Sequence, residues 1–253
     1  MNSEQTNTSE IITAAMVVIG DEILSGRTRD TNAAHLASVM TAIGVDLVEV
    51  RFVADDENAI IEAVNELRAR NTYVFTSGGI GPTHDDITAD SVSKAFGLPC
   101  DHDERALEVL ATHYEAKGVE FTDARKRMAR IPEGAGLIDN PISKAPGFLV
   151  GNVHVMAGVP RIFEAMLDNV AGTLRTGRKL SSKTIKCPYG EGTIGVPLGK
   201  VQDDNPDTII GSYPKFEGEK FSTDIVIRGA DEAAIEKAYA DVEAMLAILA
   251  NKQ

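Results

Sequence analysis

The sequence predicts an α/β protein with a doubly wound, mostly parallel sheet and a small α+β appendage at its C-terminal end. Strand-length apolar runs alternate with helical patterns over the first hundred residues, and the first run, 13–19, is apolar throughout. Continuous apolar runs are typical of parallel strands buried on both faces, and strands alternating with helices form right-handed crossovers. A change of composition at 172–182 then predicts a domain boundary. We therefore expect a disordered tail at 1–12 and domains at 13–175 and 183–253.

Three strand and helix pairs are predicted in the first half. Helical spacing of apolar residues begins at Asp30 and ends at Gly44. A strand at 46–53 alternates through Val48, Val50 and Phe52, and Asp55 or Asp56 caps the helix that follows. The remaining elements of the first domain are a strand at 73–76, a helix from 88 to 97, helices at 103–117 and 122–130, a turn-rich loop at 140–148, two short strands around 151–152 and a helix from 160. The second domain is expected to contain strands at 184–189, 209–214 and 222–228, and helices at 196–202 and 231–249.

Composition excludes several classes of protein. The 253 residues carry a net charge of −13, which argues against a nucleic-acid-binding surface. Cys100 and Cys187 lie far apart without C-x-x-C spacing, so neither a disulfide framework nor a cysteine metal site is expected. The polar start lacks the pattern of a signal peptide, and no run of eighteen apolar residues predicts a membrane span. We expect a cytoplasmic protein.

The stretch at 73–97 is the strongest candidate for a site. A short strand ends in Gly78, Gly79 and Gly81, and Thr88 then offers its hydroxyl as the N-cap of a helix. Glycines let backbone N–H groups approach an anion, and a helix N-terminus favours negative charge. Asp85 and Asp86 lie between the glycines and the helix, where an anion is tolerated only with a cation. The pattern predicts a phosphate and divalent-metal site; the alternative is an ordinary tight connection between a strand and a helix.

Several motifs in order resemble one protein family. The run G-G-I-G-P-T-H-D-D-I-T from Gly78 resembles the G-G-x-G-P-x-x-x-D-x-T pattern of the MoaB/Mog-type molybdopterin-binding domain, which has a three-layer α/β/α fold. The run G-D-E-I-L-S-G-R-T-R-D-T-N from Gly20 is similar to the opening of the CinA (competence/damage-inducible protein A) amino-terminal branch, which N-P-I-S-K-A-P-G-F and M-A-G-V-P-R-I-F-E-A-M also match. I-G-S-Y-P from Ile210 is similar to the tail of CinA-like proteins and of eukaryotic FAD synthases. The resemblance covers nearly the whole chain from Ala14.

The resemblance implies particular site residues. Asp86 matches the acidic position of the family loop and is expected to be the catalytic, metal-binding carboxylate. Asp55 matches a second acidic position, with a helix cap as the equal alternative; Asp85 is expected to contribute through water, and Lys144 to balance phosphate charge unless it is merely solvated. The other expected ligand contacts are Gly20, Asp21, Glu22, Ser25, Gly26, Asp30, Thr31, Asn32, Thr76, Ser77, Gly78, Gly79, Ile80, Gly81, Pro82, Thr83, Thr88, Gly158, Val159 and Pro160. Thr31 and Asn32 have the alternative of simply starting their helix. The basic run 125–130 is interpreted as a solvated helix face, with contact to a nucleotide phosphate from a neighbouring subunit as the alternative.

The family contains two functional classes. Some members bind molybdopterin and adenylylate or carry it, whereas CinA-type and FAD-synthase-type domains resemble metal-dependent hydrolases of ADP-ribose or FAD. We expect hydrolysis of a nucleotide pyrophosphate with Mg²⁺, Mn²⁺ or Co²⁺; the alternative is a non-catalytic molybdopterin-binding or molybdenum-cofactor biosynthesis protein. The resemblance also implies a homo-oligomer, and the chain ends before the nicotinamide-nucleotide amidase domain of longer CinA proteins, so that activity is not expected. Neither nucleic acid nor membrane is an expected partner.

Overall fold

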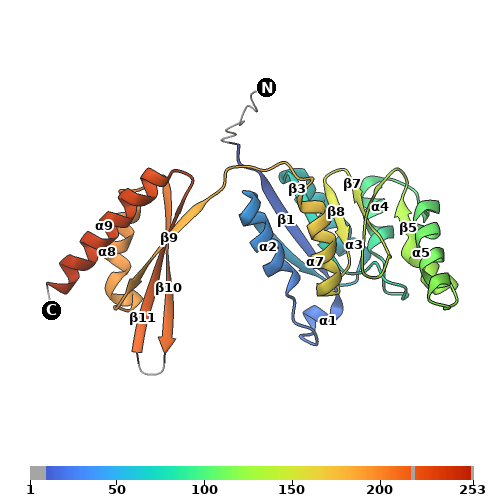
Figure 1. Ribbon diagram of the computed structural model, residues 1–253, viewed down its shortest axis with the longest axis horizontal. Helices are drawn as coiled ribbons and strands as arrows, with labels where there is room; N and C mark the ends of the chain where they lie inside the picture. The colour runs from blue at the N-terminus through green and yellow to red at the C-terminus, as the bar shows by residue number, and fades with distance from the viewer. Residues whose placement is uncertain (1–9, 218–219, 252–253) are drawn as a thin grey trace. The chain divides into compact units, whose positions relative to one another are not determined.

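The computed structural model describes residues 10–217 and 220–251 of the chain (Figure 1). These residues form two compact units, which meet in the sequence between Gly177 and Arg178. Most of the expected disordered tail at 1–12 lies outside the described residues.

The first unit is built on a six-stranded sheet with the strand order β2-β1-β3-β8-β7-β6. Four neighbouring strands are parallel: β2 (Asp46–Val53), β1 (Thr13–Ile19), β3 (Tyr73–Ser77) and β8 (Val153–Met156). β7 (Gly147–Val150) and β6 (Gly136–Ile138) continue the sheet antiparallel. The chain passes from β1 to β2 on one side of β1 and then to β3 on the other side, so the direction of winding reverses beside β1. The predicted doubly wound, mostly parallel sheet is therefore confirmed.

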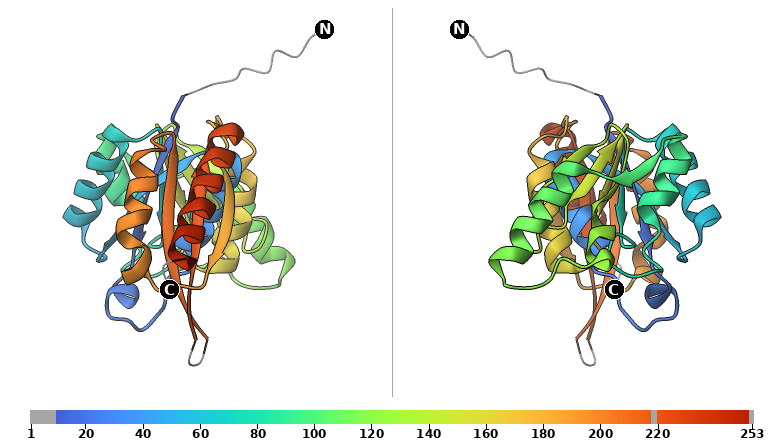
Figure 2. Two further views of the ribbon diagram at one scale, coloured as in Figure 1. Left: turned by 90° about the vertical axis from the view of Figure 1, so that its left-hand side faces the viewer. Right: turned by 90° about the vertical axis from the view of Figure 1, so that its right-hand side faces the viewer.

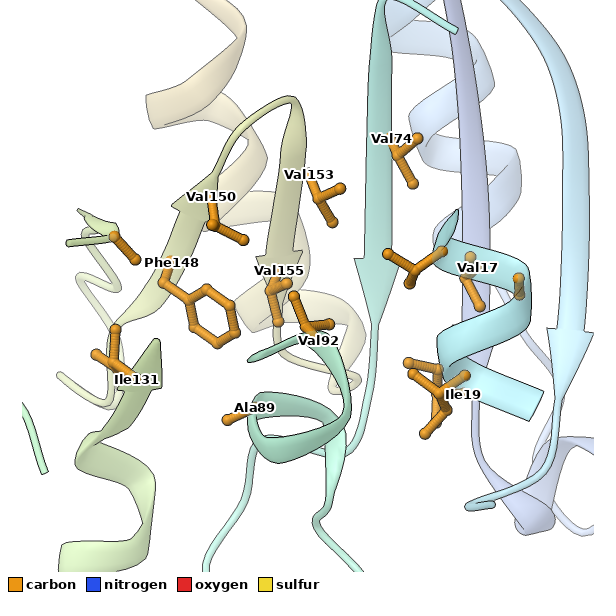
Figure 3. Packing of buried hydrophobic residues seen from close by; sticks show 14 of the residues in the cluster. Val17, Ile19, Val74, Ala89, Val92, Ile131, Phe148, Val150, Val153 and Val155 are labelled. Carbon is orange, nitrogen blue, oxygen red and sulfur yellow. The ribbon is translucent and has the colours of Figure 1, made fainter. Parts of the chain in front are cut away.

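Helices cover both faces of this sheet and bury its alternating apolar residues. On one face, α2 (Asn32–Ile43) and α7 (Pro160–Ala171) pack against Met16, Phe75 and Met156. On the other, α3 (Glu57–Arg70), α4 (Thr88–Phe96) and α5 (Glu104–Ala116) enclose a second cluster, whose centre is formed by Val17, Val74, Val155 and Phe148 (Figure 3). Beyond α5 follow α6 (Asp123–Lys126) and the 3₁₀ turn η1 (Arg127–Ala129), and β4 (Cys100–His102) pairs with β5 (Arg130–Pro132).

One local prediction is wrong. The helix expected at 122–130 ends early, and Arg130 begins β5. The strand expected at 46–53 is confirmed as β2, the outermost strand, on which Val48 and Phe52 are 56% and 46% exposed. A short helix, α1 (Asp21–Leu24), follows β1 and was not among the expected elements.

The second unit is a three-stranded antiparallel sheet, β10-β11-β9, with two helices on one face (Figures 1 and 2). The strands are β9 (Ser181–Cys187), β10 (Thr208–Glu217) and β11 (Lys220–Gly229), and the helices are α8 (Glu191–Asp203) and α9 (Glu232–Ala250). α8 is longer than the expected 196–202 because Ile194, Leu198 and Val201 bury one face despite Pro197. At the edge of the sheet, the Gln202 side chain accepts a hydrogen bond from Ile210 N and donates one to Thr208 O, at 2.7 and 2.8 Å. None of the helices in the described ranges combines the length and apolar character needed to cross a membrane.

Candidate functional site

The carboxyl ends of four parallel strands bring the expected site residues to one edge of the first sheet. Gly20 follows β1, Asp55 lies two residues after β2, Gly78 follows β3, and Gly158 lies two residues after β8. Because parallel strands end on the same side, segments far apart in the sequence share this edge. Ligands of open α/β sheets bind at such an edge where the strand order reverses, as it does here beside β1.

A cleft of about 460 Å³ opens at this edge. Its lining comes from the loops after β1, β3 and β8 and from the 140–145 turn. Among the expected residues it contains Glu22, Gly78, Gly79, Ile80, Gly81, Pro82, Asp86, Gly158, Val159 and Pro160. The first turns of α4 and α7 flank these loops, so two helix N-termini lie beside one cavity.

The glycines are required because the backbone approaches its neighbours closely. A Cβ on Gly78 would lie 2.2 Å from Ile19 O, and one on Gly79 would lie 2.1 Å from Thr88 Oγ1. Both residues also have positive φ, of +106° and +67°. The expected N-cap role of Thr88 is wrong: Ile87 precedes the helix, and the Thr88 hydroxyl donates to Gly78 O at 3.0 Å. Thr88 therefore fastens the helix start to the glycine loop.

Asp86 projects into the cleft from a closed turn. Its Oδ2 accepts hydrogen bonds from both the backbone N and the hydroxyl of Thr83, at 2.8 and 2.5 Å. Within the described part of the chain, no group donates to Oδ1. One carboxylate oxygen is thus held by the protein, while the other is available to a ligand.

Asn32 connects three of the loops. Its side chain is 3% exposed, and Nδ2 donates to Ser77 Oγ at 2.6 Å and to Gly158 O at 2.8 Å. The helix start is confirmed for Asn32, yet its amide also joins the ends of β3 and β8. The backbone N–H groups at this helix start bond instead to Asp30, which accepts from Asn32 N and Ala33 N.

Asp55 has a different environment from Asp86. Its Oδ2 accepts from Asp21 N at 3.0 Å, and Asp21 Oδ1 accepts from Asp55 N at 3.4 Å, so the two residues join α1 to the end of β2. Asp55 does not line the cleft, and Asp56 rather than Asp55 caps α3. Burial raises the pKa of Asp55, and the negative charges of Asp21, Glu22 and Asp85 raise it further, while the Asp21 N–H lowers it.

The remaining expected residues lie around the cleft rather than in its lining. Thr76 is buried within β3, and its hydroxyl has no partner among the described residues. Ser25 and Gly26 are exposed after α1, and Thr31 is exposed before α2. Lys144 is half-buried, with a left-handed backbone at φ +64°.

Seven cleft-lining residues were not expected individually: Thr28, Met128, Asn140, Ser143, Ala145, Ala157 and Ile162. Asn140 is 1% exposed and forms the 140–145 turn, because Oδ1 accepts from Ile142 N and Ser143 N and Nδ2 donates to Ala145 O. The N-P-I-S-K-A-P run marked this segment as part of the family pattern but gave its residues no role. Arg127, assigned to a solvated face, instead contacts the glycine loop.

Carboxylates gather at this edge without forming a complete cage for a metal. In the described ranges no three His, Cys, Asp or Glu side chains are arranged to hold an ion. Two carboxylates, Glu22 and Asp86, line the cleft. Such a set fits Mg²⁺ or a similar hard cation only when ligand phosphates complete its coordination, which is the usual arrangement for Mg²⁺.

Residues 15–176 match the family model described as a probable molybdopterin binding domain. The chain belongs to this molybdopterin-binding family. Residues 179–251 match the model of the FAD synthase middle domain. The chain is 33% identical over 235 residues to a protein of Archaeoglobus fulgidus, covering 91% of this chain and 96% of the relative. It is 35% identical over 211 residues to a protein of Pyrobaculum arsenaticum, covering 80% of each.

The structure of CinA from Thermoplasma acidophilum, a protein of unknown function, is also similar. It is 34% identical with a TM-score of 0.59, and the match covers 64% of this chain and 98% of that one. The predicted CinA-like membership of the molybdopterin-binding family is therefore confirmed.

Proposed function

We propose that the chain binds a phosphorylated heterocyclic ligand in the cleft together with a divalent cation, and hydrolyses a nucleotide pyrophosphate of the ADP-ribose or FAD class. The observation that carries this proposal is the combination, in one cavity, of the Gly78–Gly81 backbone, two flanking helix N-termini and the Asp86 carboxylate. Backbone N–H groups and helix dipoles stabilise phosphate oxygens, and they do so most strongly where charge develops during the reaction.

The charge of the site favours a cation. Glu22 and Asp86 line the cleft. The negative charges of Asp21, Glu22 and Asp85 lie near enough to Asp55 to raise its pKa. A phosphorylated ligand would be repelled by these carboxylates unless a positive ion lay between them.

We assign Mg²⁺, Mn²⁺ or Co²⁺ first to Asp86 Oδ1. Glu22 is the second carboxylate of the cleft lining. Asp55, expected to bind the metal together with Asp86, accepts a hydrogen bond from Asp21 N in α1, so it would attract the cation by its charge without binding it directly. A bound cation would neutralise phosphate oxygens and make the phosphorus more open to attack by water. The Gly78–Gly81 backbone would orient the phosphates, and the apolar lining, including Ile80, Met128 and Val159, would exclude water from the heterocycle.

The match of residues 179–251 to the FAD synthase middle domain favours a nucleotide ligand. The match of residues 15–176 to a probable molybdopterin binding domain favours the second candidate, a protein that binds molybdopterin without turnover. Self-association, implied by the family resemblance, is part of either proposal and is measured by light scattering.

A hydrolysis panel separates the two functions. ADP-ribose, FAD, NADH and dinucleoside polyphosphates are incubated with each cation at neutral and alkaline pH. We expect turnover that a chelator abolishes and that Asp86→Asn lowers by on the order of 100-fold, since Asp86 would act on charge developing in the transition state. Asp168→Asn is the matched control, because Asp168 is exposed on α7 and outside the cleft lining. No turnover in the panel, together with tight binding of molybdopterin, would overturn the hydrolase proposal in favour of the second candidate.

A further inference from the structure

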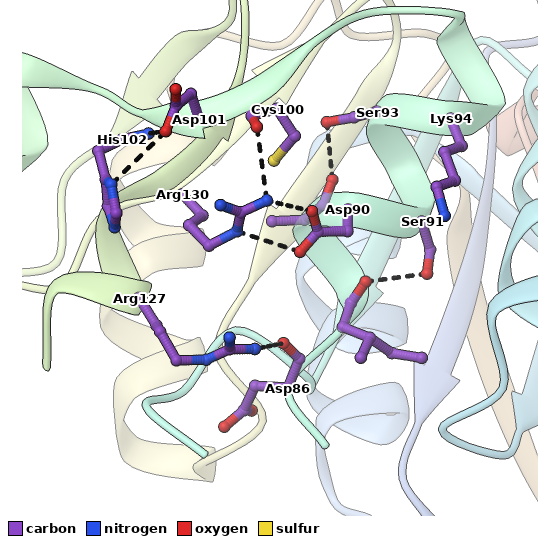
Figure 4. A network of polar contacts seen from close by, with 12 residues as sticks. Asp86, Asp90, Ser91, Ser93, Lys94, Cys100, Asp101, His102, Arg127 and Arg130 are labelled. Atoms are coloured by element: carbon purple, nitrogen blue, oxygen red, sulfur yellow. Dashed lines mark hydrogen bonds and ion pairs between the residues drawn. The ribbon is translucent and has the colours of Figure 1, made fainter. Parts of the chain in front are cut away.

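Arg127 bridges the turn that carries Asp86. Its Nη2 donates to Asp86 O at 3.3 Å (Figure 4). Its Nε donates to Thr83 O at 3.2 Å. Arg127 reaches this turn from η1, more than forty residues along the chain. A guanidinium donates in a fixed planar fork, so the two bonds set the spacing of the carbonyl groups as well as their position.

The same turn is closed from within by Thr83 and Asp86. Asp86 N donates to Thr83 O at 3.3 Å, and Thr83 N donates to Asp86 Oδ2 at 2.8 Å. Thr83 O thus accepts from both Asp86 and Arg127. Because these internal bonds span three residues of an exposed loop, they do not anchor the turn to the rest of the unit; Arg127 supplies that connection.

Arg130 fixes the segment from which Arg127 projects. It forms a two-pronged ion pair with Asp90 of α4 and donates to Cys100 O at 3.4 Å (Figure 4). Burial raises the pKa of Asp90, but hydrogen bonding and charge from Arg130, with the charge of Arg127, outweigh it and leave that pKa below its usual value. The segment 127–130 is therefore tied to the helix that follows the glycine loop.

We propose that Arg127 is a positioning residue of the cleft, which holds the Thr83–Asp86 turn so that the free carboxylate oxygen of Asp86 faces the bound ligand. Arg127 also lines a small recess beside the cleft with Gly79, Gly81 and Asp86, where its charge offsets the carboxylates. The effect on catalysis rests on the proposed function, whereas the effect on the turn does not.

The test compares Arg127→Gln with Arg125→Gln in the full chain. Arg125 is a matched control, because it is a half-buried arginine of the adjoining helix α6 that stacks on Tyr114 at 4.7 Å and donates to Glu120 O. Hydrogen exchange of the Thr83 and Asp86 amides is measured without ligand. We expect Arg127→Gln to speed it roughly tenfold, the effect of losing one or two hydrogen bonds, and Arg125→Gln to leave it unchanged.

Kinetics supply the second measurement. We expect Arg127→Gln to lower kcat by about tenfold with KM nearly unchanged, because displacement of Asp86 would reduce stabilisation of the transition state more than binding of the substrate. Guanidinium ion should partly restore kcat in Arg127→Ala but not in Asp86→Asn. Unchanged exchange, or faster exchange with unchanged kcat and KM, would overturn the assignment. If the unmodified chain hydrolyses nothing in the panel, the proposed function fails, and the exchange rates still decide whether Arg127 holds the turn.

Discussion

Replacement of Asn32 by Ala should loosen the cleft and destabilise the first unit. The change removes the hydrogen bonds from Nδ2 to Ser77 Oγ and to Gly158 O, at 2.6 and 2.8 Å, from a side chain that is 3% exposed. Two net hydrogen bonds contribute about 2 kcal/mol, and the carbonyl left without a donor adds about 1 kcal/mol. We expect a loss of about 3 kcal/mol in the free energy of unfolding, or about 6–12 °C in Tm for a unit of this size.

Urea titration followed by circular dichroism measures this loss. Asn169→Ala is the control, because the exposed Asn169 amide makes a single bond of 3.3 Å to Asp139 O and should change stability by less than about 0.5 kcal/mol. Asn32→Asp should cost more than Asn32→Ala, since it places a carboxylate against the Gly158 carbonyl. If Asn32→Ala is as stable as Asn169→Ala, the amide does not hold the loops together.

Three further outcomes follow from single contacts. Burial lowers the pKa of His154 to about 4, whereas the same histidine in the unfolded chain binds its proton near pH 6.5. The free energy of unfolding should therefore fall by about 3 kcal/mol as the pH drops from about 6.5 to about 4. Urea titrations over this range should show a smaller fall for His154→Phe. Gly79→Ala should cost at least about 1 kcal/mol more than Gly97→Ala, because both have positive φ but only the former puts Cβ against Thr88; equal costs in thermal melts would contradict the close-packing argument. Asp56→Ala should cost about 1 kcal/mol and Asp56→Asn much less, because the side chain caps α3; the same loss in both variants would exclude capping.

Elements with a strong local pattern could be predicted from the sequence. β1 is apolar at every position that the sheet buries, and the predicted bounds 13–19 agree with those of the strand. α7 begins at Pro160 and α4 is followed by Gly97 in a left-handed conformation, both as expected. In these cases one residue type or one short run determines the local backbone, so no distant contact is needed to infer it.

Roles that depend on a distant partner were missed or misplaced. The sequence predicts that the Thr88 hydroxyl caps its helix, but in the fold Ile87 precedes the helix and the hydroxyl donates to Gly78 O, ten residues earlier. Asp55 and Asp86 both looked like site carboxylates, and only the position of α1 separates them. Arg127 resembled a solvated arginine because the turn that it contacts lies more than forty residues away.

The hydrogen bonds of Gln202 have a consequence for how the second unit meets other chains. The sheet has two edges, β10 and β9, and at the first a strand from another molecule would have to bond to the outward backbone groups of β10. Gln202 already occupies those of Thr208 and Ile210, and four residues beyond Ile210, on the same side of the strand, Pro214 has no N–H to offer. One amide side chain and one proline thus remove several of the backbone groups that β10 would offer to another strand, and strand addition is disfavoured at this edge of the unit.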